Sequence, residues 1–346
     1  MPELLLTPLP YAYSEQPSLT GLLRRQPEDF IVEEILGFEP EGEGEHVFLW
    51  IEKTGLNTQH VADRIARLAK LAAHQVSYSG MKDRNAVTRQ WFSAHLPGNK
   101  ELDWQLLADG QIKILKSVRH LRKLRRGVHK ANRFTIRVSD IDGDLAGLKE
   151  RLTEIARQGV PNYFGEQRFG FDGANLVKAQ QLFAGSFKAK RHQRGIYLSA
   201  ARSYLFNQLL ASRIIAQNWN RPLGGELLML SGSHSVFLQA DEPGLADRLS
   251  TADIHLTGPM YGKASSLCCA DAVADLEQAI LSAYPDILAG LEREGLKAER
   301  RALRAIPEDL SWQIDKQHIE LSFSLVSGCF ATAVVRELVN YKICRQ

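Results

Sequence analysis

The sequence predicts an α+β protein in which one domain interrupts another. At 346 residues the chain exceeds the length that one hydrophobic core usually serves. Strand and helix patterns alternate along the first 158 residues, and a last strand and helix at 318–341 are a natural complement to them. We therefore expect residues 1–158 and 305–346 to form one discontinuous domain, a mixed sheet flanked by helices, with residues 159–304 as an inserted α/β domain.

The elements of the first domain follow from the period of its apolar residues. Alternation of apolar and polar residues predicts strands at 20–25, 30–35, 46–52, 87–94, 111–118 and 133–140. Apolar residues at helical spacing predict a helix that Asn57 or Thr58 caps and that ends near His74, and a second helix at 144–157.

The amino-acid composition of the chain changes at Gly159. The segment 159–170 is dense in glycine and aromatic residues, a composition typical of functional loops. Helices are predicted at 174–184, 199–218 and 271–295, with strand-like sequence at 224–239. The chain closes with a strand at 318–326, a turn at Ser327–Gly328 and a helix at 330–341.

Composition excludes several classes of protein. Apolar residues make up 44% and charged residues 24%, and no apolar run approaches the ~18 residues of a membrane span. The N-terminus lacks the pattern of a secretory signal. The four cysteines show no metal-binding spacing, and no P-loop or H-E-x-x-H motif is present. We therefore expect a cytoplasmic protein with reduced thiols and with neither metal nor cofactor.

The charge is unevenly distributed. The net charge is only +3, yet the stretch from Gly110 to Ser139 has no acidic residue. It contains ten cations: Lys113, Lys116, Arg119, Arg122, Lys123, Arg125, Arg126, Lys130, Arg133 and Arg137. A second basic cluster lies at 188–194. Such a block favours a nucleic-acid partner, although a solvated basic face without a ligand is the alternative.

Asp83 is the main candidate for chemistry. Gly80, which tolerates the positive φ of tight turns, is followed by the charged run Lys82-Asp83-Arg84 and then by a predicted strand. Neighbouring cations favour the ionised carboxylate, and an ionised aspartate on a rigid turn is able to act as a nucleophile. The alternative is a solvated turn with surface ion pairs worth under ~1 kcal/mol.

Three further residues each allow two interpretations. Phe30 is either a core strand residue or a ring that stacks on a planar base. Arg24 is either a surface cation or the preferred partner that holds Asp83 ionised, with Lys82 as the second choice. Asn132 is either a turn residue or an amide whose donor and acceptor read a nucleobase edge.

Several segments together resemble one family. The segment Gly80-Met-Lys-Asp-Arg-Asn-Ala-Val-Thr-Arg-Gln90 closely resembles the G-x-K-D-x-x-A-V-T-x-Q motif of the TruD family of tRNA pseudouridine synthases. Further similar segments occur in the family's order: 27–33, 42–46, 132–134, 159–170, 327–332 and 336–338. The departures are small: Val326 stands where a proline is common, and Cys329 replaces a serine.

The resemblance implies a function and a site. Asp83 would be the catalytic aspartate and nucleophile, and Phe30, Asn132 and Phe330 match positions that contact the target uridine. The implied substrate is uridine 13 in the D-arm of tRNA, flipped out of its stack. The implied fold is a pseudouridine-synthase catalytic domain interrupted by a TRUD domain.

The resemblance and the composition also limit the partners and cofactors that we expect. We expect a monomer that needs no protein partner, membrane, metal or cofactor. The alternative function is a catalytically silent RNA-binding protein or tRNA chaperone that uses the same basic block.

Overall fold

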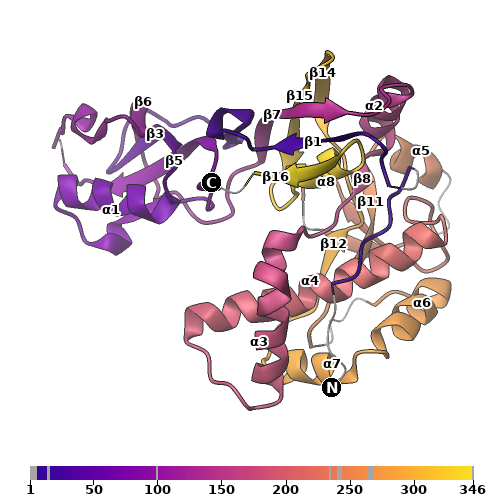
Figure 1. Ribbon diagram of the computed structural model, residues 1–346. Helices are drawn as coiled ribbons and strands as arrows, with labels where there is room; N and C mark the ends of the chain where they lie inside the picture. Colours follow the sequence, from indigo (N-terminus) through magenta and orange to yellow (C-terminus); the bar gives the residue numbers. More distant parts are fainter. Residues whose placement is uncertain are drawn as a thin grey trace. The chain divides into compact units, whose positions relative to one another are not determined.

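The chain forms two compact units. The computed structural model describes residues 6–13, 16–98, 100–233, 235–239, 244–263 and 268–344. The first unit contains the residues up to Pro17 together with Gly147–Ile306 and Cys329–Leu338. The second unit contains Ser18–Ala146, Pro307–Gly328 and the residues from Val339 onward, so it combines the first strands of the chain with the last ones (Figure 1).

The second unit is built on a ten-stranded mixed sheet. Its main path runs β14-β15-β7-β2-β5-β3-β6, with β1, β16 and β4 attached at the side. The strands are β1 (Thr20–Leu23), β2 (Phe30–Ile35), β3 (His46–Thr54), β4 (Val76–Tyr78), β5 (Val87–His95), β6 (Ile112–His120), β7 (Ala131–Asp142), β14 (Glu308–Ile314), β15 (His318–Val326) and β16 (Asn340–Ile343). The pairs β2–β5 and β1–β16 are parallel. The other pairs are antiparallel.

One helix covers part of this sheet. Helix α1 (Thr58–Ala69) lies alongside β3 and β5 (Figure 1). Its apolar face, including Val61 and Ile65, packs with buried residues of these two strands. It ends earlier than the predicted His74 because Lys70 adopts a left-handed conformation with φ 55°. The helix thereby brings Thr58, which is fully buried, next to the turn between β4 and β5.

The first unit surrounds a separate core. Its helices are α2 (Leu148–Gln158), α3 (Ala174–Phe183), α4 (Arg191–Ile215), α5 (Leu245–Ser250), α6 (Asp271–Leu281), α7 (Pro285–Arg293) and α8 (Ala331–Arg336). One sheet has the order β10-β9-β11-β12, with β9 (Leu227–Leu230), β10 (Val236–Leu238), β11 (Ile254–Met260) and β12 (Glu299–Ala302), and a second pairs β8 (Val160–Pro161) with β13 (Arg304–Ala305). Helix α4 runs through this unit (Figure 1) and contributes much of its core, including Leu205 and Leu209.

A buried ion pair connects α4 to β9. Arg213 Nη2 lies 2.8 Å from Glu226 Oε1, and both side chains are almost completely inaccessible to solvent. The guanidinium also donates to the carbonyl oxygens of Asn218 and Arg221 at 2.8 and 3.0 Å. These additional bonds matter because an isolated buried charge is costly, whereas a fully hydrogen-bonded one is tolerated.

The predicted α+β class with a mixed sheet is confirmed. Two predicted elements are wrong. The helix predicted at 330–341 is α8 alone, and the chain then enters strand β16, which pairs with β1. The helix predicted at 271–295 is two helices, because Pro285 starts α7 after a break. Of the helices in the described part of the chain, none combines the length and hydropathy that a bilayer crossing needs.

The predicted domain boundaries, between residues 158 and 159 and between residues 304 and 305, stay a prediction, and so do the roles of the two domains. Parts of their ranges, including Ala240 to Pro243, lie outside the described residues.

Candidate active site

The turn that carries Asp83 is held from two neighbouring elements. Thr58 Oγ1, on α1, accepts a hydrogen bond from the backbone N–H of Lys82 at 3.0 Å, and its hydroxyl donates to Gln90 Oε1 at 2.9 Å. Gln90 Nε2, on β5, donates to the carbonyl of Gly80 at 3.0 Å. Side chains that are themselves fully buried therefore fix the backbone immediately before Asp83.

Gly80 itself is explained by packing. It is not among the glycines with positive φ, so the turn at this position does not use the conformational freedom of glycine. A Cβ atom here would lie 3.3 Å from His129 Cε1. The close approach of the imidazole leaves little room for a side chain.

Lys53, which the sequence did not single out, supports the turn from β3. Its side chain is fully buried, and its ammonium donates to the carbonyl oxygens of Leu56 and Asp83 at 2.8 and 2.9 Å. Burial lowers the pKa of Lys53 to about 8, although the negative charge of Asp83 opposes this change.

Arg24 binds the Asp83 carboxylate. Arg24 Nη2 donates to Asp83 Oδ2 at 2.8 Å, and the side chains are 14% and 30% exposed. The guanidinium also lies over the ring of Phe30, with Cζ 4.0 Å from the ring centroid. Arg24 reaches this position with φ 60°, a conformation that is strained for a residue with a side chain. Its Nε is buried and has no hydrogen-bond partner among the described residues.

Lys82 contacts other groups. Its ammonium lies 3.1 Å from Glu34 Oε2 and donates to Asn132 Oδ1 at 2.7 Å. The role of Lys82 as a support for Asp83 stays a prediction, because the contacts of its ammonium are to Glu34 and Asn132.

These contacts belong to a closed ring of five side chains, which we call the buried ring: Glu34, Ser79, Lys82, His129 and Asn132. Ser79 Oγ donates to Glu34 Oε2 at 2.6 Å and lies 3.0 Å from His129 Nδ1. A longer contact of 3.4 Å between His129 Nε2 and Asn132 Nδ2 closes the ring. Ser327 Oγ also lies 3.0 Å from His129 Nε2. At most 9% of each residue's surface is exposed for Glu34, Ser79, His129 and Asn132.

The predicted site residues are distributed over both units. Arg24, Phe30, Lys82, Asp83 and Asn132 lie in the second unit, where Phe30 is 2% exposed and has Arg24 over one face. Phe330 belongs to the first unit. It is half-buried there, and its ring contacts Phe164 and the guanidinium of Arg168. A position of Phe330 beside Asp83 stays a prediction.

The basic block divides into bound and free cations. Several of its members are held within the second unit: Lys113 by Glu52, Arg137 by Glu320, and Arg119 by the carbonyls of Gly44, Leu96 and Lys100. The side chains of five exposed members have no ion pair or hydrogen bond to any described residue: Lys116, Arg122, Arg125, Lys130 and Arg133. These free cations are available to an anionic partner.

The loop 121–130, which contains three of the free cations (Arg122, Arg125 and Lys130), is attached to the segment that leads into the turn. The backbone N–H of Gly127 donates to the carbonyl of Ser79 at 2.7 Å, and Ser77 Oγ donates to the carbonyl of Leu124 at 2.8 Å. Arg122 and Arg125 flank Leu124, which is 2% exposed and anchors the loop in the core. The basic loop is therefore fixed to the segment that leads into Asp83.

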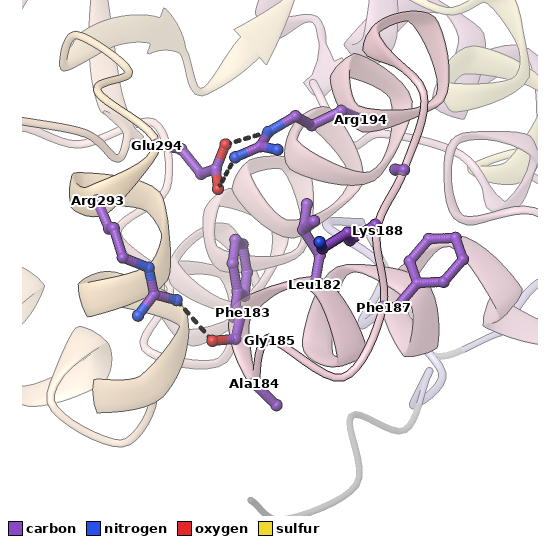
Figure 2. Close-up of a pocket in the computed structure, with 10 residues that line it drawn as sticks. Leu182, Phe183, Ala184, Gly185, Phe187, Lys188, Arg194, Arg293 and Glu294 are labelled. Carbon is purple, nitrogen blue, oxygen red and sulfur yellow. Dashed lines mark hydrogen bonds and ion pairs between the residues drawn. The ribbon is translucent and has the colours of Figure 1, made fainter.

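A pocket of about 530 Å³ lies in the first unit, among α3, α4 and α7 (Figure 2). Its charged lining is largely engaged: Arg194 binds Glu294 through two hydrogen bonds of 2.5 and 2.6 Å, and Arg293 donates to the carbonyl of Phe183. None of the predicted site residues lines this pocket. Across the described ranges, no group of three or more His, Cys, Asp or Glu side chains is arranged to hold a metal ion.

Comparison with known proteins identifies similar chains. The family model described as "tRNA pseudouridine synthase D (TruD)" matches residues 9–189 and 174–338. The tRNA pseudouridine synthase D of Hydrogenovibrio crunogenus is 43% identical over 335 residues, which is 96% of each chain. That of Aeromonas salmonicida is 46% identical over 325 residues, 94% of this chain and 92% of the relative. A crystal structure of a putative tRNA pseudouridine synthase D from Methanosarcina mazei superposes with a TM-score of 0.69 over 95% of both chains, at 22% identity. At this identity the likeness supports the fold.

Proposed function

The chain belongs to the TruD family of tRNA pseudouridine synthases, and we propose that it isomerises uridine 13 in the D-arm of tRNA to pseudouridine. The family membership supports a tRNA pseudouridine synthase. The specific position of the uridine and the roles of the residues below are part of the proposal.

The reaction exchanges one bond of the nucleotide for another. The N1–C1′ bond breaks, the uracil turns, and C5 bonds to C1′, while the proton lost from C5 is balanced by the one that N1 gains. Asp83 acts as the nucleophile, at C1′ of the ribose or at C6 of the base. Arg24 supports this role because its guanidinium binds the carboxylate at 2.8 Å and fixes its position.

The target uridine must leave its stack before Asp83 can reach it. In the proposal, Phe30 and Phe330 contact the flipped base, and Asn132 reads its edge. The amide of Asn132 has donor and acceptor capacity left after its contacts with Lys82 and His129, since Nδ2 has a second hydrogen and Oδ1 a second lone pair. The exposed cations Arg122 and Arg125 bind phosphates of the tRNA.

The observation that carries the proposal is the environment of Asp83. Its carboxylate is bound to a guanidinium, and Lys53, Thr58 and Gln90 hold the backbone of its turn. A surface turn with incidental ion pairs does not need these buried supports. A fixed carboxylate of this kind fits a nucleophile that must meet the reacting atom without rearrangement.

The test compares Asp83→Ala with the wild type on an unmodified tRNA transcript that has uridine at position 13. We expect Asp83→Ala to bind the transcript normally and to form no pseudouridine, as mapped by carbodiimide-dependent primer stops. Asp63→Ala, which removes an exposed carboxylate of the same unit, is the matched control and should keep full activity. A transcript with cytidine at position 13 should give no stop there.

Two results would contradict the proposal. Pseudouridine formation by Asp83→Ala would remove Asp83 from the mechanism. A wild type that binds tRNA but modifies none would favour the alternative, a catalytically silent RNA-binding protein or tRNA chaperone, for which wild type and Asp83→Ala behave alike.

A further inference from the structure

The contacts of the buried ring define one arrangement of hydrogen atoms in which every one of them is a hydrogen bond. The ammonium of Lys82 is solely a donor, so the amide atom that faces it at 2.7 Å must be the oxygen of Asn132. The nitrogen of the amide then faces His129 Nε2, which therefore has to accept. Ser327 Oγ also lies 3.0 Å from this nitrogen atom, and its hydroxyl is able to donate to an accepting Nε2.

The opposite side of the imidazole leads to the same tautomer. Ser79 has a single hydroxyl hydrogen and donates it to Glu34 Oε2 at 2.6 Å. Ser79 Oγ consequently accepts from His129 Nδ1, so Nδ1 has the hydrogen atom. The Ser79 side therefore places a hydrogen on Nδ1, and the Asn132 side adds that Nε2 accepts, so that together they describe a neutral His129 protonated on Nδ1.

The backbone holds His129 in this position on both sides. Gly127 N–H donates to Ser79 O at 2.7 Å, and Lys130 N–H donates to Ile35 O at 2.8 Å. Ser327 N–H, from the turn after β15, donates to Lys130 O at 3.2 Å. An imidazole anchored in this way cannot easily move to accommodate a change in its protonation.

A second proton on His129 would break the ring. Nε2 would then be a donor toward Ser327 Oγ at 3.0 Å, and it could no longer accept from the Asn132 amide, which would lose its contact with the imidazole. Turning the amide would only set its nitrogen against the ammonium of Lys82, which is also a donor. The imidazolium would also be buried at 8% exposure close to the ammonium of Lys82.

The charged groups that face His129 are Lys82, from the turn before β5, and Glu34, from β2. Burial lowers the pKa of His129 below its ordinary value, Lys82 lowers it further, and Glu34 opposes them. The neutral form is thus the one that the folded protein favours near neutral pH.

We propose that His129 is a positioning residue that orients the Asn132 amide toward the target uridine, and that protonation of its imidazole switches the synthase off. The proposal rests on the function proposed above. It adds a residue that does not touch the substrate and that acts through its contacts with Asn132, Ser79 and Ser327.

The test measures kcat/KM for pseudouridine formation between about pH 5 and pH 8, a range that brackets the ordinary histidine pKa. The wild-type rate should fall about tenfold for each pH unit below the pKa of the imidazole. His129→Gln keeps an acceptor that does not titrate, so it should lose this acid decline. His129→Leu has no acceptor and should lose roughly tenfold or more at neutral pH, with unchanged tRNA affinity.

The matched control is His46→Gln. His46 is another partly buried histidine of the second unit and also has a lowered pKa, but it lies outside the ring. This variant should keep the acid decline of the wild type. The inference is overturned if His129→Gln declines with pH like the wild type, or if His129→Leu matches the wild type at neutral pH.

A spectroscopic readout separates this inference from the proposed function. Long-range ¹H–¹⁵N spectra of the histidine rings in the wild type should show His129 protonated on Nδ1 alone at neutral pH, whether or not the protein modifies RNA. A signal from a proton on Nε2 would overturn the inference. A wild type without synthase activity but with the Nδ1 tautomer would refute the proposed function and leave the ring geometry supported.

Discussion

Arg24 offers a way to separate electrostatics from backbone strain at the active site. Its guanidinium makes one charge-assisted hydrogen bond to Asp83, and its backbone has φ 60°. A hydrogen bond to a charged group contributes about 1.5–3 kcal/mol. If this contribution stabilises the transition state relative to the free enzyme, its loss should lower kcat/KM roughly 10- to 150-fold. We expect this loss in both Arg24→Ala and Arg24→Gly.

The two variants should differ in stability. Alanine keeps the left-handed strain that arginine has, whereas glycine relieves it. After allowing for the greater flexibility of glycine in the unfolded chain, Arg24→Gly should be more stable than Arg24→Ala by about 1 kcal/mol. Urea denaturation of both variants measures this difference, and single-turnover assays with tRNA measure the catalytic one.

Arg24→Lys is the control for charge alone. It keeps a cation near Asp83 but loses the planar group that lies over Phe30, so its activity should be intermediate. The reasoning is refuted if Arg24→Ala retains wild-type kcat/KM, because the carboxylate would then not depend on this partner. An equal stability of the alanine and glycine variants would refute the strain argument separately.

Two further predictions concern RNA binding and acid stability. Replacing Arg122 and Arg125 by Gln should reduce the slope of log Kd for tRNA against log salt by about 2, because each free cation that contacts a phosphate contributes about 1 to the slope. The control is Arg137→Gln, which should leave the slope unchanged because the cation of Arg137 is bound to Glu320. An unaltered slope in the double variant would contradict contact with phosphates. His255 accepts a hydrogen bond from Arg304 Nε at 3.2 Å, and burial, with Arg304 second, lowers its pKa to about 4. Below the ordinary histidine pKa of 6.5, the unfolded chain therefore binds more protons than the folded protein. The stability contributed by neutral His255 is complete above that pH, and the free energy of unfolding should fall by about 3 kcal/mol as the pH drops toward 4. Urea denaturation across this range should show a smaller loss for His255→Gln than for the wild type, and equal losses would contradict the assignment.

The prediction at the C-terminus failed because long-range pairing outweighed the local pattern. Apolar residues at helical spacing predicted a helix through Tyr341, but α8 ends at Arg336. Asn340 to Ile343 instead pair in parallel with Thr20 to Leu23 at the other end of the chain. No local pattern reports such a partner, whereas the predicted strand 318–326 was correct because it alternates strictly.

The sequence nominated Asp83, with Arg24 as the preferred partner of its carboxylate and Lys82 as the second choice. Lys82 was a candidate partner because it is adjacent in the chain. Adjacent residues of a non-helical segment point their side chains to different sides, so Asp83 contacts Arg24 while Lys82 contacts Glu34 and Asn132. Sequence distance was therefore a poor guide to contact, and the partner of Asp83 is the residue that is 59 positions away.

The buried ring lay beyond sequence reasoning because each of its members has an ordinary explanation when taken alone. Ser79 and His129 are typical loop residues, and their burial is decided only when the loop 121–130 packs against the turn before β5. The one available signal was Glu34. On β2 the buried positions are Phe30, Val32 and Glu34, so a carboxylate occupies a place where alternation predicts an apolar side chain. A buried acid in a strand requires donors from elsewhere in the fold, and here Ser79, Lys82 and the backbone of Trp91 supply them. That requirement predicts the existence of a polar network next to Asp83, while its members and the tautomer of His129 follow only from the three-dimensional structure.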